Sequence, residues 1–272
     1  MLKLFYITNN PDVAKIAQTC GVDRIFVDME YIGKDLRQGG LDTVKNHHTI
    51  NDIKNIRRVV DKSELLVRVN PLHNGSKEEI DETVNAGADV IMLPMWKTPE
   101  DVKLFLDLVG GRAKTLLLLE TKEAMDCVDE VISQGGFDEV HIGLNDLSLS
   151  LGKKFLFELL TDGTVDFLAE KFRKNGVTFG FGGFGRVFHG GLLPAENIVA
   201  EHYRLKSSAA ILSRAFCNTS KITDIKEIEE IFSNGLKDTR DYEKELEKKS
   251  PEFFEDTHKR TAEIIRQIVS DK

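Results

Sequence analysis

The chain has 272 residues, enough for one large domain or two small ones. It carries 37 Lys and Arg residues against 45 Asp and Glu, a formal net charge of −8, and no basic stripe, so nucleic acid is not an expected partner. Its three cysteines lie far apart without a CxxC pair, which argues against a zinc site and favours the reducing cytoplasm. We expect no membrane span, because no apolar run approaches the roughly 20 residues that one needs.

Short apolar runs alternate with helical patterns along most of the chain. The apolar runs predict eight strands, over 3–8, 23–30, 64–70, 89–95, 115–120, 140–146, 177–183 and 209–216. Helices are predicted between them, over 11–20, 50–60, 76–86, 99–109, 124–132, 152–175 and 194–205. Eight such alternations predict an α/β fold, a closed (β/α)8 TIM barrel, with a doubly wound open sheet as the alternative. No GxGxxG sequence opens a helix, so no nucleotide cofactor is expected.

The composition changes at about residue 221, where a helical pattern dense in charged residues begins. A last helix is predicted from Pro251, because proline is favoured at the first position of a helix. We therefore divide the chain into a barrel domain, 1–220, and a C-terminal helical extension, 221–272. These additional helices either cover the barrel or pack on a neighbouring subunit.

Two consecutive predicted strands end on a carboxylate, the fifth at Glu120 and the sixth at Asp146. The carboxyl ends of consecutive parallel strands meet at one edge of the sheet, where active sites of α/β folds lie. Two carboxylates side by side repel each other unless a hard divalent cation binds both. The alternative is that each residue caps the helix that follows its strand.

The residues around these two carboxylates resemble a known family. Leu-Leu-Glu-Thr at 118–121 and Ile-Gly-Leu-Asn-Asp-Leu-Ser-Leu-Ser-Leu-Gly at 142–152 resemble the metal-binding core of the HpcH/HpaI family. That family contains class II 2-oxo-acid aldolases and citrate lyase beta subunits, and the resemblance extends over about residues 3–217. It implies that Glu120 and Asp146 bind Mg²⁺ or Mn²⁺, and that a 2-oxo acid is cleaved or formed through a metal-stabilised enolate. Asn145 and Asp146 are then expected to contact the substrate.

Arg68 lies at the end of the third predicted strand, in a segment that resembles the strand-three motif of the same family. A guanidinium binds carboxylate or enolate oxygens through paired hydrogen bonds, so Arg68 is a candidate for substrate binding and catalysis. The alternative is a structural ion pair with Glu120 and Asp146. Trp96, the only tryptophan, follows the fourth strand and is expected either to wall the substrate pocket or to pack in the core.

The sequence departs from the aldolase branch of the family at the general base. The aldolases carry Asp-x-Glu-His after strand two, whereas this chain has Tyr31 in place of the histidine, and Asn85 in place of an aspartate that orients it. The loop after Tyr31 is longer and ends in two histidines. We therefore predict that His47 or His48 acts as the general acid/base, or that Glu30 does so if both histidines are merely solvated.

Several functional alternatives stay open on the sequence alone. A citrate-lyase-like cleavage of an acyl-CoA ester would use basic groups around the mouth, for which Lys97, Arg186 and Arg214 are candidates. A non-catalytic carboxylate-binding barrel and another enolate reaction, such as phosphoenolpyruvate mutation or hydrolysis, are the others. We also expect a cytoplasmic homo-oligomer that associates through its C-terminal helices.

Overall fold

Eight parallel strands close into a barrel in the order in which they follow along the chain. The computed structural model describes residues 1–33 and 48–271. The strands are β1 (Lys3–Ile7), β2 (Arg24–Asp28), β3 (Glu64–Arg68), β4 (Val90–Leu93), β5 (Lys114–Leu119), β6 (Glu139–Ile142), β7 (Thr178–Phe184) and β8 (Ala209–Leu212). The pairing of β8 with β1 closes the ring and confirms the predicted TIM barrel over the doubly wound alternative.

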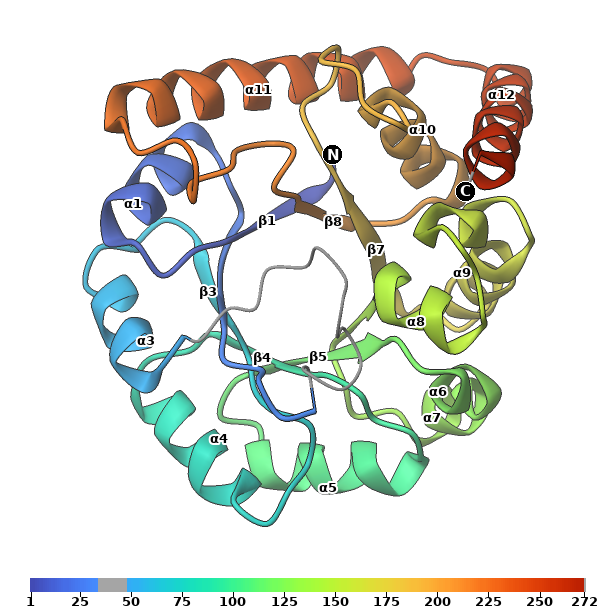
Figure 1. Ribbon diagram of the computed structural model, residues 1–272. Coiled ribbons are helices and arrows are strands. Elements are labelled where there is room, and N and C mark those ends of the chain that lie inside the picture. Colours follow the sequence, from blue (N-terminus) through green and yellow to red (C-terminus); the bar gives the residue numbers. More distant parts are fainter. Residues whose placement is uncertain (34–47, 272) are drawn as a thin grey trace.

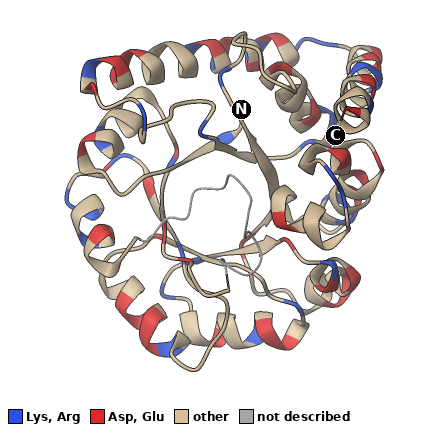
Figure 2. Cartoon of the chain, in the orientation of Figure 1, with Lys and Arg blue, Asp and Glu red and all other residues tan. Residues whose placement is uncertain are grey.

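Helices form an outer layer around the strands, as the view along the barrel in Figure 1 shows. They are α1 (Pro11–Cys20), α3 (Ile50–Arg57), α4 (Ser76–Asn85), α5 (Pro99–Val109), α6 (Lys122–Asp126), α7 (Val128–Gln134), α8 (Leu144–Ser150), the 3-10 helix η1 (Leu156–Leu160), α9 (Thr164–Lys174), α10 (Ala195–Leu205), α11 (Ile225–Leu246) and α12 (Pro251–Ser270). Charged residues lie mainly on this outer layer (Figure 2), so the space between helices and strands is left to apolar side chains. No helix in the described part of the chain is both long enough and apolar enough to cross a bilayer.

Side chains of each strand alternate between the barrel interior and the helical layer, as the two-residue period of a strand requires. In β2, Ile25 and Val27 pack towards the helices, while Phe26 belongs to the separate cluster that fills the barrel. That inner cluster consists of Phe5, Phe26, Leu66, Val90, Met92, Leu116, Leu118 and Ala209. Arg24 and Asp28 share the parity of Phe26, so they enter the barrel below and above this apolar layer.

An ion-pair network closes the amino-terminal end of the barrel. Arg24, whose side chain is 0% exposed, donates to both carboxylate oxygens of Glu139 at 2.6 and 2.7 Å and to Glu64 at 2.7 Å. Lys3 and Lys114 add outer ion pairs to Glu139 and Glu64. This end of a TIM barrel serves stability, so the chemistry belongs at the opposite end.

The glycine-rich sequence of β7 matches the close approach of β7 to β8. A Cβ added at Gly183 would lie 2.5 Å from the carbonyl oxygen of Ile211, and one at Gly180 would collide with the carbonyl of Ala209. Close approach of the two backbones therefore requires glycine at these positions.

The C-terminal region forms two helices that pack on the chain's own barrel. α11 follows β8 and packs against α1, so it takes the place of the helix after the eighth strand. α12 packs against α10, where Asn197 donates to Thr261 at 2.9 Å and His258 lies 2.9 Å from Glu201. The domain boundary near residue 220 and the homo-oligomer stay predictions.

Candidate active site

Arg68 is the centre of the carboxyl-terminal mouth of the barrel. β2 and β3 pair so that Asp28 stands opposite Arg68. The guanidinium donates to both oxygens of Asp28, each at 2.8 Å, and lies 3.1 Å from Glu30 Oε2. Both carboxylates are 1% exposed, so three charged groups share a site that is largely shielded from solvent. An ion-pair role was one of the alternatives for Arg68, but with Glu120 and Asp146 as partners. The described contacts include Asp28 and Glu30, and Glu120 lies near enough to help stabilise the charge of Arg68.

The charge of Arg68 is secured by its surroundings. Burial lowers the pKa of this guanidinium, but the nearby carboxylates of Asp28, Glu30 and Glu120 outweigh that effect and raise the pKa above its usual value. The guanidinium carbon also lies 5.8 Å from the centre of the Phe26 ring, at the top of the inner apolar layer. Arg68 is therefore a permanent, fixed positive charge beside Glu120.

Glu120 follows β5 and is buried at the mouth. Its Oε1 accepts the backbone N–H of Met95 at 3.1 Å. Gly143, after the neighbouring strand β6, lies so close that an added Cβ would stand 2.9 Å from Glu120 Oε2. The cap of α6 is Thr121, whose hydroxyl accepts the N–H of Ala124. The alternative in which Glu120 caps this helix is therefore wrong.

The turn after β4 fixes the positions of Glu120 and Thr121 through two hydrogen bonds. Met95 adopts φ 55°, the left-handed region that a residue with a side chain rarely enters, and this conformation is part of the turn that aims its N–H at Glu120. The next carbonyl, that of Trp96, accepts the Thr121 hydroxyl at 3.0 Å. The indole of Trp96 is 3% exposed and packs in the cluster between strands and helices. Its predicted contact with substrate stays a prediction.

Asp146 lies in the first turn of α8 and not at the end of a strand. The sixth strand ends at Ile142, and α8 begins at Leu144 because Gly143 turns the chain into the helix. The strand predicted over 140–146 was therefore too long. Asn145 and Asp146 are both partly buried, and Gly143 brings this turn against Glu120. The two predicted metal ligands thus come from the segments that follow two neighbouring strands, β5 and β6.

The segment after β2 is fixed although it is not a strand. The N–H of Asp28 donates to Nδ1 of His48 at 3.0 Å, and that of Met29 donates to the carbonyl of Arg68 at 3.0 Å. Since a backbone N–H only donates, Nδ1 of His48 is an acceptor, which places the proton of the neutral ring on Nε2. His48 therefore lies at the end of β2 with a defined tautomer. His47 lies outside the described residues.

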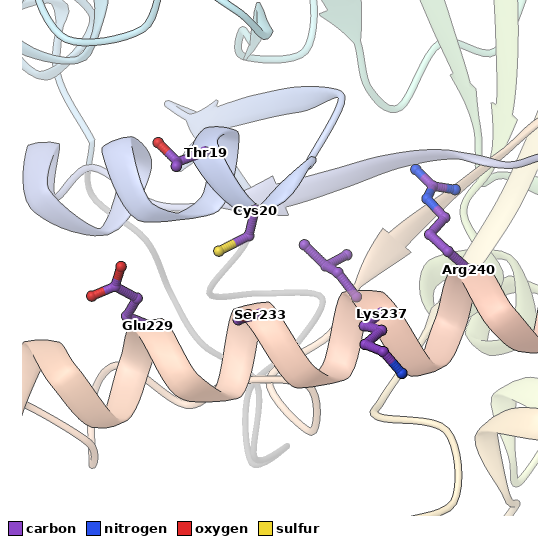
Figure 3. Close-up of a pocket in the computed structure, with 7 residues that line it drawn as sticks. Thr19, Cys20, Glu229, Ser233, Lys237 and Arg240 are labelled. Atoms are coloured by element: carbon purple, nitrogen blue, oxygen red, sulfur yellow. The ribbon is translucent and has the colours of Figure 1, made fainter.

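The three basic candidates for a CoA ester lie after β4, β7 and β8. Lys97 is exposed and pairs with Glu123 at 2.9 Å. Arg186 lines a small hollow of about 210 Å³ together with residues of α11, and Arg214 is exposed. A larger groove of about 450 Å³ lies between α1 and α11 (Figure 3). It is lined by Thr19, Cys20, Glu229, Ser233, Leu236, Lys237 and Arg240. None of its lining residues belongs to the predicted site.

The mouth of the barrel offers carboxylate oxygens, which are the ligands that hard cations such as Mg²⁺ prefer. Among residues 1–33 and 48–271, no three His, Cys, Asp or Glu side chains gather as a complete metal cage. Glu120, directly after β5, and Asp146, in the first turn of α8, offer carboxylate oxygens. Mg²⁺ typically takes one or two carboxylates and completes its shell with water and substrate. The residues present thus fit a magnesium-type site.

Fold and site together define an α/β barrel whose mouth gathers buried carboxylates around one arginine. A family model for the HpcH/HpaI aldolase/citrate lyase family matches residues 2–156, more than half of the chain. The chain belongs to this family, as the sequences around Glu120 and Asp146 predicted, and membership supports a lyase or aldolase function.

Solved structures share the fold. An HpcH/HpaI aldolase from Desulfitobacterium hafniense DCB-2 has a TM-score of 0.60 at 16% identity, with 84% of this chain and 93% of that one covered. An HpcH/HpaI aldolase/citrate lyase family protein from Burkholderia cenocepacia J2315 has a TM-score of 0.61 at 15% identity, with 84% and 95% covered. No curated protein matches the sequence significantly.

Sequence reasoning missed two contributors to the site. Asp28 is not among the site residues predicted from the sequence, although the pairing of its strand with that of Arg68 makes it the main partner of the arginine. Met95 contributes its backbone N–H, and such a contact cannot be inferred from the type of side chain at that position. The register between strands two and three could have revealed Asp28, whereas nothing in the sequence marks Met95.

Proposed function

We propose that the chain is a class II, divalent-cation-dependent carbon–carbon lyase that cleaves or forms a 2-oxo acid through a pyruvate-type enolate. The observation that carries this proposal is the fixed charge of Arg68 beside Glu120, at the mouth of a barrel of this family. An enolate and a 2-oxo acid both present oxygens with negative charge, which a buried guanidinium stabilises.

Glu120 and Asp146 are the residues that would hold Mg²⁺ or Mn²⁺. When bound, the cation acts as a Lewis acid towards the keto oxygen of the substrate. Met95 fixes Oε1 of Glu120 through its N–H. The backbone of Gly143 lies against Oε2, so little freedom is left to the carboxylate. Such fixation of a ligand is what preorganises a metal site.

Arg68 orients the substrate by charge and hydrogen bonding. Asp28 and Glu30 engage three of the five N–H groups that a guanidinium carries, and this fixes the plane of the fork. We assign the other two N–H groups to the carboxylate or enolate oxygens of the substrate. Because its position is set before substrate arrives, Arg68 needs little reorganisation during the reaction.

His48 and Glu30 divide the hydrogen-bonding and proton-transfer roles. With Nδ1 accepting from Asp28, neutral His48 presents an Nε2–H, which serves as a hydrogen-bond donor to the aldehyde oxygen and keeps its own proton. Glu30 carries carboxylate oxygens beside Arg68 and is the candidate that accepts a proton. His47 is the remaining candidate that the sequence supplies. Asn145, next to Asp146 in α8, completes the predicted substrate contacts.

The test is exchange of the C3 protons of pyruvate in D₂O, followed by NMR with Mg²⁺, Mn²⁺ or EDTA. We expect exchange that needs the metal, disappears in Glu120→Gln, and falls by about 10²-fold in Glu30→Gln. His48→Gln should lower carbon–carbon cleavage more than C3 exchange, because the donor acts on the aldehyde oxygen.

The outcomes separate the alternatives. Exchange that persists in EDTA would contradict the metal-dependent mechanism. No exchange under any metal would remove pyruvate as the nucleophile. An acyl-CoA cleavage assay would then decide between the citrate-lyase-like alternative and a non-catalytic barrel. Cleavage that depends on Lys97, Arg186 or Arg214 would favour the acyl-CoA ester.

A further inference from the structure

Asn70 links the strand that carries Arg68 to the segment that carries Glu30. It lies two residues beyond Arg68 and is 4% exposed. Its side-chain oxygen accepts two consecutive backbone N–H groups, those of Tyr31 and Ile32, each at 3.0 Å. One amide thus anchors the chain directly after Glu30.

The other end of the Asn70 amide is anchored in turn by α4. Its Nδ2 donates to Glu79 Oε1 at 2.7 Å, and its backbone N–H donates to the same oxygen at 3.2 Å. The second oxygen of Glu79 lies 3.1 Å from Nε2 of His73, whose Nδ1 accepts the N–H of Gly75. His73 therefore donates from Nε2, and Glu79 is held from both sides. The amide of Asn70 has its orientation fixed, because an exchange of its oxygen and nitrogen would break its bonds to Tyr31, Ile32 and Glu79.

These contacts complete an unbroken series of backbone hydrogen bonds. Asp28 donates to His48, Met29 to the carbonyl of Arg68, and Glu30 to Oδ1 of Asp28 at 3.3 Å. Tyr31 and Ile32 then donate to Asn70. Five consecutive N–H groups are thus satisfied in a segment whose last four residues belong to no strand or helix. This is a rigid connection where a loop end would ordinarily be mobile.

We propose that Asn70 is a positioning residue, held by Glu79 and His73, that fixes the backbone after β2 and so keeps the Glu30 carboxylate on Arg68. The role of Glu30 in proton transfer rests on the proposed function, whereas the positioning itself does not. Because a group that moves protons must lie within hydrogen-bond reach of its target, a displacement near 1 Å costs about 10²-fold in rate.

The first measurement is residue-resolved amide hydrogen exchange, which needs no substrate. In Asn70→Ala we expect the amides of Tyr31 and Ile32 to exchange at least about 10²-fold faster, with Leu66 inside β3 unchanged. Asn197→Ala is the matched control, because it removes an asparagine hydrogen bond to Thr261 in the outer layer. Unchanged exchange at Tyr31 and Ile32, or an equal rise in the control, would overturn the proposal.

A paired substitution separates positioning from general loss of packing. Asn70→Asp keeps an acceptor for the two N–H groups but places a second carboxylate against Glu79, so protection should fall. Adding Glu79→Gln supplies a donor to the new carboxylate, and protection at Tyr31 and Ile32 should return in part, because the backbone N–H of residue 70 loses its acceptor. A double variant no better than Asn70→Asp alone would contradict the assigned hydrogen bonds.

The effect on catalysis is tested by a double-mutant cycle that combines Asn70→Ala with Glu30→Gln and measures C3 exchange. Asn70→Ala alone should lower kcat by about 10-fold to 10²-fold, and add less than about 2-fold in the Glu30→Gln background. Independent, multiplicative losses would overturn the link to Glu30. If wild-type protein shows no exchange activity, the proposed function fails, and the amide-exchange result still decides the positioning role.

Discussion

Glu120 and Gly143 touch across the ends of β5 and β6. A Cβ added at Gly143 would lie 2.8 Å from Cβ and 2.9 Å from Oε2 of Glu120, closer than real Cβ contacts come. The φ of Gly143 is −81°, a value open to any residue, so space and not backbone conformation requires glycine here. The absent side chain leaves room for the carboxylate.

We expect Gly143→Ala to displace the Glu120 carboxylate and weaken Mn²⁺ binding by about 10-fold or more, the range seen when support of a metal ligand is lost. Titration followed by electron paramagnetic resonance measures the affinity directly. Gly235→Ala is the matched control, since its added Cβ would meet Phe216 at 2.9 Å, in the helix α11 and not beside Glu120. That variant should lose stability and keep its Mn²⁺ affinity. Equal affinities for Gly143→Ala and wild type would show that Glu120 is not a ligand.

Arg68→Lys keeps the positive charge and removes the planar guanidinium that makes paired hydrogen bonds to Asp28. An ammonium group cannot make the two parallel bonds to Asp28 together with the contact to Glu30. We expect a loss of about 2 kcal/mol in the free energy of unfolding and a large fall in C3 exchange. Urea denaturation measures the first and NMR the second.

Arg204→Lys is the matched control for Arg68. Arg204 makes a similar fork to Asp166 at 2.6 and 3.0 Å, and its side chain is 14% exposed, as is that of Arg68. Its replacement should cost comparable stability and leave exchange unchanged. A parallel loss of activity in both variants would mean that Arg68 acts only through the fold.

Sequence patterns predicted the barrel because a closed parallel sheet leaves a strong periodic signal. Each strand needs one apolar face inside and one outside, and each helix needs an apolar stripe. Glu120 and Asp146 were predicted as site carboxylates because the sequences around them combine the end of a predicted strand with a family motif. Family and fold therefore followed from local patterns.

What the sequence did not reveal depends on contacts between distant segments. Asp28 binds Arg68 across 40 residues, and Asn70 binds Tyr31 across 39. No local periodicity encodes such pairs, since they arise only when the register of two strands is known. The end of β6 was misplaced for a related reason. Leu144 follows the buried run that ends at Ile142 and is itself apolar, which favours a longer strand, and only the turn at Gly143 starts the helix there.

A substitution of Arg24 tests whether the amino-terminal end of the barrel serves stability while the carboxyl-terminal mouth serves the chemistry. Arg24→Met leaves Glu139 and Glu64 without the guanidinium that joins them. Removing one partner of a buried ion pair costs about 3–5 kcal/mol. We expect urea denaturation to show a loss of this size and Mn²⁺ affinity to be unchanged in the folded protein. A change in affinity without a loss of stability would contradict the assignment of this end of the barrel to stability.

Acid is expected to lower the stability of the folded protein through His141. Burial lowers the pKa of His141, inside the barrel, to about 4, against opposing effects of its bond to the Gly182 carbonyl and of Glu139. The unfolded chain, with a histidine pKa near 6.5, then binds more protons than the folded one between these two values. Stability is therefore unaffected above about pH 6.5 and falls as the pH drops towards 4.

Between pH 7.5 and pH 5 this one histidine should remove about 2 kcal/mol from the free energy of unfolding. His141→Gln, whose amide can still donate to Gly182, should flatten the decline by that amount in urea denaturation at the two pH values. A residual slope is expected from His202, whose pKa burial also lowers. His189→Gln, at an exposed position, serves as the control and should keep the wild-type slope. Identical slopes for His141→Gln and wild type would show that His141 takes up no proton on unfolding in this range.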